Sequence, residues 1–177
     1  AVENQFQYKS PEFSGATLYA SYAKGDAVAG GASDVSNIDY GIQYTGVEGL
    51  ELGYAFGDKE STLASKFEQN ILYAKYAYGP ITVGYSISEN DAETANRDIE
   101  STAVGISYAV NEDFTVSYGI HEIEYDQYTS DQEASGFSAS YTAGGMTIGG
   151  MMNNVDNVGG TAATDTKGYE ISINFAF

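Results

Sequence analysis

The chain has 177 residues and is strongly acidic, because 25 Asp and Glu residues face only 7 Lys and Arg residues and give a formal net charge of −18. This balance excludes the basic footprint that nucleic-acid binding requires, and it excludes an electrostatic attachment to anionic lipid surfaces. Because the chain has no cysteine, it can form no disulfide, no thiolate metal site and no thiol nucleophile.

Apolar and polar residues alternate with a period of two along most of the chain, most clearly at residues 50–56, 81–87, 104–110 and 114–120 and at the end. Such alternation places every apolar side chain on one face of a β-strand. A sustained 3.6-residue period and an apolar run of about 20 residues are both lacking, so helix is expected to be minor or absent. In chain order we predict eleven strands, at residues 3–9, 15–23, 35–45, 49–57, 67–78, 80–88, 98–110, 113–125, 133–143, 146–153 and 167–177.

The connections between these strands alternate in length. Short turns are predicted at residues 10–14, 46–48, 79–80, 111–112 and 144–145, and longer polar loops at 24–34, 58–66, 89–97, 126–132 and 154–166. Short turns at one end and long loops at the other are typical of an antiparallel up-and-down transmembrane β-barrel. A soluble sandwich with Greek-key crossings would mix the two lengths.

The two faces of the predicted strands differ in a way that favours a membrane barrel over a soluble β fold. One face carries small or polar residues, such as Thr82, Gly84, Ser86 and Ser88. The other face carries apolar residues, with aromatic rings near the strand ends that match interfacial girdles. The rings are those of Tyr40, Tyr44, Tyr76, Tyr78, Tyr169 and Phe177. We therefore expect a lipid-facing outside and a watery lumen.

The end of the chain resembles the last strand of bacterial outer-membrane proteins. In residues 167–177, aromatic or aliphatic residues alternate with polar ones and finish on an aromatic residue. The resemblance implies integral localisation in the bacterial outer membrane and a signal that the outer-membrane assembly machinery reads. The residues that carry this assembly signal are Tyr169, Ile171, Ile173, Phe175 and Phe177.

The start of the chain resembles a segment of the Gram-negative general diffusion porins. Residues 4–15 contain an Asn, a Tyr-Lys pair, a Ser-Pro turn, a Phe and a Gly, as in the strand and turn that follow the constriction loop of that trimeric family. The resemblance implies a 16-stranded barrel, a homotrimer, contact with outer-membrane lipid and lipopolysaccharide, and passive diffusion without a cofactor.

The strand count bears on domain organisation. A closed antiparallel barrel with both termini in the periplasm needs an even number of strands, and eleven is odd. We therefore expect residues 1–177 to be the C-terminal part of a single transmembrane β-barrel domain, with about five strands and the constriction loop before Ala1. If one strand is miscounted, the chain is instead a complete channel of ten to twelve strands.

Four charged residues are candidates for the pore lining. The resemblance implies that Lys9 faces the lumen opposite the acidic residues of the constriction loop. Strand parity places Asp39, Glu51 and Lys75 on the same inner face. Because two of these three are acidic and the net charge is negative, we expect the pore to prefer cations.

The remaining chemistry is limited. Most of the acidic residues are assigned to the long loops, where Ca²⁺ or Mg²⁺ could bridge them to lipopolysaccharide phosphates, although a solvated acidic surface is the favoured interpretation. His121 is the only histidine, and the chain has no Gly-x-Ser-x-Gly motif, so no enzymatic activity is expected.

The sequence therefore predicts an outer-membrane porin for the passive diffusion of small hydrophilic solutes and ions. The alternatives are an outer-membrane structural or adhesion barrel with a closed lumen, and a soluble secreted β protein.

Overall fold

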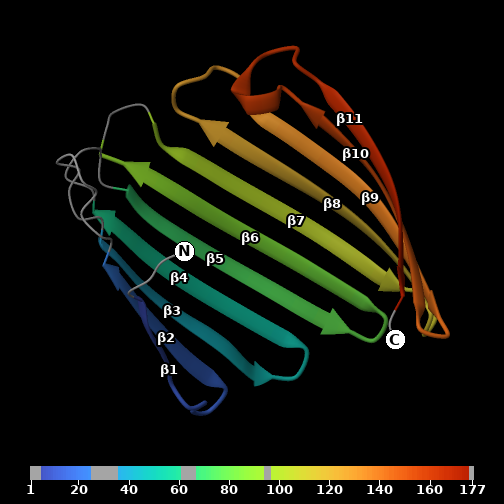
Figure 1. The fold of residues 1–177 in the computed structure, drawn as a ribbon, viewed down its shortest axis with the longest axis horizontal. Helices are drawn as coiled ribbons and strands as arrows, with labels where there is room; N and C mark the ends of the chain where they lie inside the picture. The colour runs from blue at the N-terminus through green and yellow to red at the C-terminus, as the bar shows by residue number, and fades with distance from the viewer. Residues whose placement is uncertain (1–4, 25–35, 61–66, 94–96, 176–177) are drawn as a thin grey trace.

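The computed structural model describes residues 5–24, 36–60, 67–93 and 97–175, which form one antiparallel sheet of eleven strands in sequence order (Figure 1). The strands are β1 (Gln5–Lys9), β2 (Ala16–Lys24), β3 (Ser36–Val47), β4 (Leu50–Glu60), β5 (Phe67–Tyr78), β6 (Ile81–Ala92), β7 (Ile99–Ala109), β8 (Phe114–Tyr125), β9 (Gln132–Ala143), β10 (Met146–Asp156) and β11 (Thr166–Phe175). In these ranges the only helix is the 3₁₀ turn η1 (Val158–Gly160). None of the described residues forms a helix long and apolar enough to cross a membrane.

The eleven predicted strands and their up-and-down order are confirmed. The main differences are at the loop ends of β4, β6 and β10, which extend to Glu60, Ala92 and Asp156 and so pass the predicted ends at residues 57, 88 and 153. The sequence reasoning ended these strands where the apolar alternation ends. The backbone ladder with the neighbouring strand does not depend on that alternation, and it continues through polar residues.

The predicted alternation of short turns and longer connections is also confirmed. At one end of the sheet the strands are joined by short turns, and at the other end the described connections are residues 126–131 and 157–165. The β9–β10 turn consists of Gly144 and Gly145, with φ angles of 57° and 81°. A two-residue hairpin with positive φ at both positions is a type I′ turn, whose twist matches the flanking strands. The predicted loops at 24–34, 58–66 and 89–97 lie partly outside the described residues.

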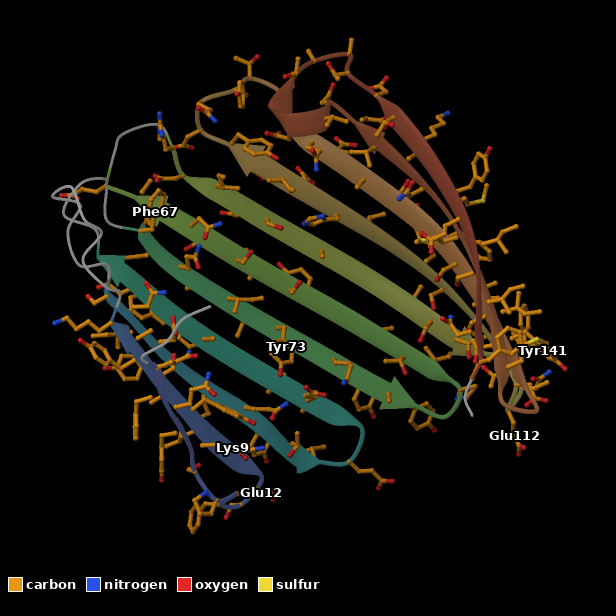
Figure 2. All side chains as sticks on the ribbon, in the orientation of Figure 1. Lys9, Glu12, Phe67, Tyr73, Glu112 and Tyr141 are labelled. Atoms are coloured by element: carbon orange, nitrogen blue, oxygen red, sulfur yellow. The ribbon has the colours of Figure 1, made fainter. Side chains whose placement is uncertain are left out.

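The strand register places the apolar side chains on one face of the curved sheet and the small polar ones on the other. Tyr118 and Ile120 are 51% and 50% exposed, whereas Gly119 and His121, which alternate with them on the other face, are half-buried. On the concave face of a curved sheet side chains converge and shield one another, so the polar face is the concave one. Figure 2 shows Tyr73, from the polar face, over the middle of the sheet.

The sheet has no hydrophobic core of the kind found in a soluble domain. Among the described residues, Ala23 is the only buried apolar residue, and no large side chain is fully buried. Apolar side chains of the outer face remain exposed over the whole width of the sheet. An exposed apolar surface of this size is stable only against lipid or another apolar partner.

The first and last strands lie at opposite edges of the sheet. In the described residues β1 pairs only with β2, and β11 pairs only with β10 (Figure 1). Each edge therefore carries backbone N–H and C=O groups without a partner strand. Such groups are too costly to leave unpaired in hydrocarbon, so a membrane sheet requires a strand at each edge.

Candidate functional site

The four charged residues that the sequence predicts on the inner face all lie on the concave face of β1–β5. Lys9 is opposite Tyr19, and Asp39 pairs across to Gly57. Glu51 and Lys75 are directly opposite each other on β4 and β5. The structure brings these last two together as an ion pair and leaves Lys9 and Asp39 outside it.

The Glu51 carboxylate accepts hydrogen bonds on both of its oxygen atoms. Its Oε2 pairs with the Lys75 ammonium. Its Oε1 accepts a hydrogen bond from Gln43 Nε2 at 2.9 Å and another from the Tyr73 hydroxyl at 3.0 Å. The Glu51 side chain is 24% exposed, whereas that of Lys75 is 51% exposed. The ion pair therefore lies with its carboxylate against the sheet and its ammonium away from it.

Tyr73 on β5 reaches Glu51 on β4 because the residue directly opposite Tyr73 is a glycine, Gly53. Gly53 is buried and opposite Tyr73, and the aromatic ring lies across the space where a side chain at Gly53 would be. A Cβ at Gly53 would be 2.1 Å from the nearest ring carbon and 2.7 Å from the hydroxyl oxygen. Because Gly53 has no side chain, the Tyr73 ring can lie across β4 at this position.

The contacts continue from Glu51 across the sheet to β1. The Gln43 amide oxygen accepts a hydrogen bond from the Tyr19 hydroxyl at 3.0 Å, and Gln43 Nε2 also lies 3.3 Å from the Tyr73 hydroxyl. The Lys9 ammonium is 5.5 Å from the centre of the Tyr19 ring, within the range of a cation–π interaction. We refer to the connected side chains as the wall network, which consists of Lys9, Tyr19, Gln43, Glu51, Tyr73 and Lys75.

Asp39 lies beside the wall network and is held in a similar way. Its Oδ2 accepts a hydrogen bond from the Ser21 hydroxyl at 2.5 Å. Its Oδ1 lies over Gly57, 2.7 Å from the position that a Cβ would take there. This acidic side chain therefore also lies close to the sheet, over a glycine.

Sequence reasoning missed four residues of the concave face, namely Tyr19, Gln43, Tyr73 and Glu170. The register places Glu170 opposite Met151 on this face, and it is exposed. Strand parity could have identified all four, because each lies an even number of residues from an inner residue of its own strand. No role is expected from the sequence for Tyr19, Gln43 or Tyr73, and Glu170 is identified there only as a polar residue of the last strand.

The position of the acidic residues differs most from the expectation. Many of those assigned to loops lie within strands, at the loop end and on the outer face. We call this row the acidic ladder; its nine members are Asp58, Glu68, Glu89, Asp91, Glu100, Glu122, Glu124, Glu133 and Asp156. Glu89 is directly opposite Glu100, which is in turn opposite Glu124. Directly opposed like charges destabilise a sheet.

The described residues contain no group of three or more His, Cys, Asp or Glu that could hold a metal ion. His121 lies on the concave face, and its Nε2 is 2.6 Å from the Ser101 hydroxyl oxygen. A Ser–His pair needs an acid on the other ring nitrogen to act as a triad. The hydrogen bonds of the described part of the chain include none from Nδ1 to a carboxylate.

Four of the five residues of the predicted assembly signal lie on β11. Tyr169, Ile171, Ile173 and Phe175 share the outer face of this edge strand and are strongly exposed, from 56% for Ile173 to 91% for Tyr169. Phe177 lies outside the described residues. A regular row of exposed apolar side chains on an edge strand is compatible with an assembly signal.

Comparison with known proteins identifies the family. The family model described as "Gram-negative porin" matches residues 1–131. No curated protein sequence matches the chain.

Solved structures of low sequence identity share the fold. The chain is similar to the anion-selective porin from Comamonas acidovorans, with a TM-score of 0.86 over 98% of this chain and 59% of that one, at 15% identity. It is also similar to OmpT, an outer membrane protein of Vibrio cholerae, with a TM-score of 0.69 over 97% and 63% of the two chains, again at 15% identity. For OccK11 (OpdR) of Pseudomonas aeruginosa the TM-score is 0.72 over 96% and 58%, at 11% identity. The chain therefore spans about three fifths of the length of these proteins.

Proposed function

The chain belongs to the Gram-negative porin family, whose members are integral in the outer membrane, and from that premise we propose that it allows small hydrophilic solutes and ions to diffuse passively through its barrel. Family membership indicates a channel rather than an enzyme. The observation that carries the proposal is the distribution of side chains over the two faces of the sheet. The outer face is apolar and exposed, as lipid contact requires, and the concave face is small and polar.

The size of the concave side chains supports an open lumen. On β6–β8 the inner positions include Gly84, Gly105 and Gly119, which the register places side by side. Small residues at these positions leave room for water, whereas a closed barrel is filled by large side chains. This supports a channel over the alternative of a structural or adhesion barrel with a closed lumen.

The cation preference expected from the sequence is not part of this proposal. That expectation depended on the net charge, and the acidic ladder contributes much of this charge on the outer face of the sheet. The four predicted wall residues themselves carry two positive and two negative charges. In addition, one structurally similar protein is named an anion-selective porin.

We also propose that residues 1–177 are the C-terminal part of a single transmembrane barrel. The unpaired edges of β1 and β11 need partner strands in a membrane. The chain spans about three fifths of the similar solved structures, which supports further strands in the same domain. An intact-mass measurement on the mature protein tests this, because a mass of 18.8 kDa would contradict it.

Three partner proposals follow from the family resemblance. We propose a homotrimer, which chemical crosslinking in native outer membranes would detect as a species of three times the protomer mass. We propose contact of the outer face with lipid and lipopolysaccharide, and recognition of β11 and Phe177 by the assembly machinery. Deletion of Phe177 should then lower the amount of folded protein in the outer membrane, with little effect on synthesis.

The decisive experiment is single-channel recording in planar lipid bilayers. The complete protein, with any residues that precede Ala1, is expected to produce stepwise conductance in KCl that grows in proportion to salt concentration. Absence of steps from protein that is folded by gel mobility would refute diffusion and favour the closed-lumen alternative.

A further inference from the structure

The wall network contains two lysines and one carboxylate, and these charged groups differ in their exposure. Both oxygens of Glu51 are engaged by donors, and the side chain is only 24% exposed. Lys75 is 51% exposed and has two further N–H donors besides the one directed at Glu51. A solute at this wall therefore meets the ammonium group before it meets the carboxylate.

On the neighbouring strands the asymmetry is one of hydrogen bonding alone, because Asp39 and Lys9 are both exposed. Asp39 is bonded to Ser21 and lies over Gly57, close to the sheet. Lys9 is exposed, and its ammonium lies over the face of the Tyr19 ring, which engages the charge without accepting a conventional hydrogen bond. Both lysines thus keep free donors, whereas both acids have donors supplied by the protein.

We propose that the β1–β5 wall is a contact surface for permeating small anions, and that Gln43 and Tyr73 are positioning residues that set this preference by holding Glu51 against the sheet. This proposal rests on the proposed function, since it requires an open pore. The solute contacts Lys75 and Lys9, while Gln43 and Tyr73 act through Glu51. Without their two hydrogen bonds on Oε1, the carboxylate is held only by its ion pair with the exposed Lys75, so it can turn toward the lumen and attract cations.

The test uses a substitution that leaves the formal charge of the pore unchanged. Tyr73→Phe removes only the hydroxyl that donates to Glu51 Oε1. In the complete protein, the chloride-to-potassium permeability ratio, measured from the reversal potential in a KCl gradient, should fall about twofold, as expected for one unit charge brought nearer to the ion path in a water-like dielectric. Tyr85→Phe on the outer face is the matched control and should leave the ratio unchanged.

A second background shows whether the effect passes through Glu51. In Glu51→Gln protein there is no carboxylate to release, so adding Tyr73→Phe should not change the ratio further. Lys75→Gln, which removes the proposed contact itself, should also lower the ratio. Retention of normal heat-modifiable gel mobility in each variant confirms folding.

The outcomes separate this proposal from the function on which it rests. If the wild-type protein conducts but Tyr73→Phe leaves the ratio unchanged, or shifts it equally with and without Glu51, the positioning role is overturned and the channel stands. If Lys75→Gln has no effect on the ratio, Lys75 is not a contact for anions. If the wild-type protein gives no conductance steps, the proposed function fails, and this proposal fails with it.

Discussion

Substitution of Gly53 by alanine tests the geometry of the wall network directly. The new Cβ would lie 2.1 Å from the nearest carbon of the Tyr73 ring and 2.4 Å from the ring carbon that bears the hydroxyl. Ordinary contact between carbon atoms is about 3.5–4.0 Å, so the ring has to move by more than about 1 Å. This displacement takes the hydroxyl out of hydrogen-bonding range of Glu51 and Gln43, which it now contacts at 3.0 and 3.3 Å.

The expected free energy follows from two opposing contributions. Forcing a side chain out of a filled position costs about 1–3 kcal/mol. Replacing glycine by alanine in a strand recovers about 0.5–1 kcal/mol, because glycine loses more backbone entropy on folding. Gly53→Ala should therefore destabilise the protein by about 0–2.5 kcal/mol. In a Tyr73→Ala background the clash is absent, and the same substitution should instead stabilise it by about 0.5–1 kcal/mol.

The measurement is a double-mutant cycle from urea unfolding in lipid vesicles, followed by far-ultraviolet circular dichroism, since the described sheet supplies a strong β signal and the chain has no Trp. The coupling between Gly53 and Tyr73 is expected to be about 1–3 kcal/mol. Gly105→Ala is the control, because a Cβ there would meet nothing closer than 3.8 Å. Effects of Gly53→Ala that agree in the two backgrounds within about 0.5 kcal/mol would refute the packing described for Tyr73.

Three further predictions concern the rest of the sheet. Glu124 lies at the loop end of β8, beyond the apolar membrane-spanning part, and the charge of Glu100 opposite it raises its pKa. Protonation of Glu124 relieves this repulsion as the pH falls toward the raised pKa, so the folded protein gains stability at lower pH. The temperature at which the folded gel band is lost should therefore rise as the pH is lowered from 7, and Glu100→Gln should reproduce part of this rise at pH 7. A temperature that stays constant or falls as the pH is lowered contradicts the prediction. Ile120→Arg on the outer face should lower the free energy of unfolding in urea by about 2–4 kcal/mol. Ser117→Arg on the concave face should leave this free energy nearly unchanged and should lower the single-channel conductance. Equal losses of free energy would mean that the two faces are wrongly assigned. Gly145→Ala, at a φ of 81°, should destabilise by about 1–2 kcal/mol in the same assay, and a neutral result would exclude the tight β9–β10 turn.

The strand arrangement could be predicted from the sequence because a single physical constraint dominates it. A strand between lipid and water has to alternate apolar and polar residues, and the segment from Ile81 to Ile87 does so without interruption. Where that constraint ends, the prediction also failed. Glu89 and Asp91 lie beyond the apolar band but remain in the backbone ladder of β6, so composition alone assigned them to a loop.

The wall network could be predicted only in part. Parity places Glu51, Tyr73 and Lys75 on one face, but it does not indicate which of them touch. The contact between Tyr73 and Glu51 is diagonal and depends on the missing side chain of Gly53 between the strands. The cation preference expected from the net charge is not supported for a related reason, because a sum over the sequence does not distinguish a carboxylate in the lumen from one on the outside.

The acidic ladder also bears on how the barrel sits in the membrane. Outer-membrane barrels carry their longer loops on the extracellular side, and the ladder lies at the loop ends of the strands. Moving an ionised carboxylate from water into hydrocarbon is costly, so a barrel that slides inward has to pull these groups out of water. The row that weakens the sheet locally therefore helps to fix the depth at which the barrel rests.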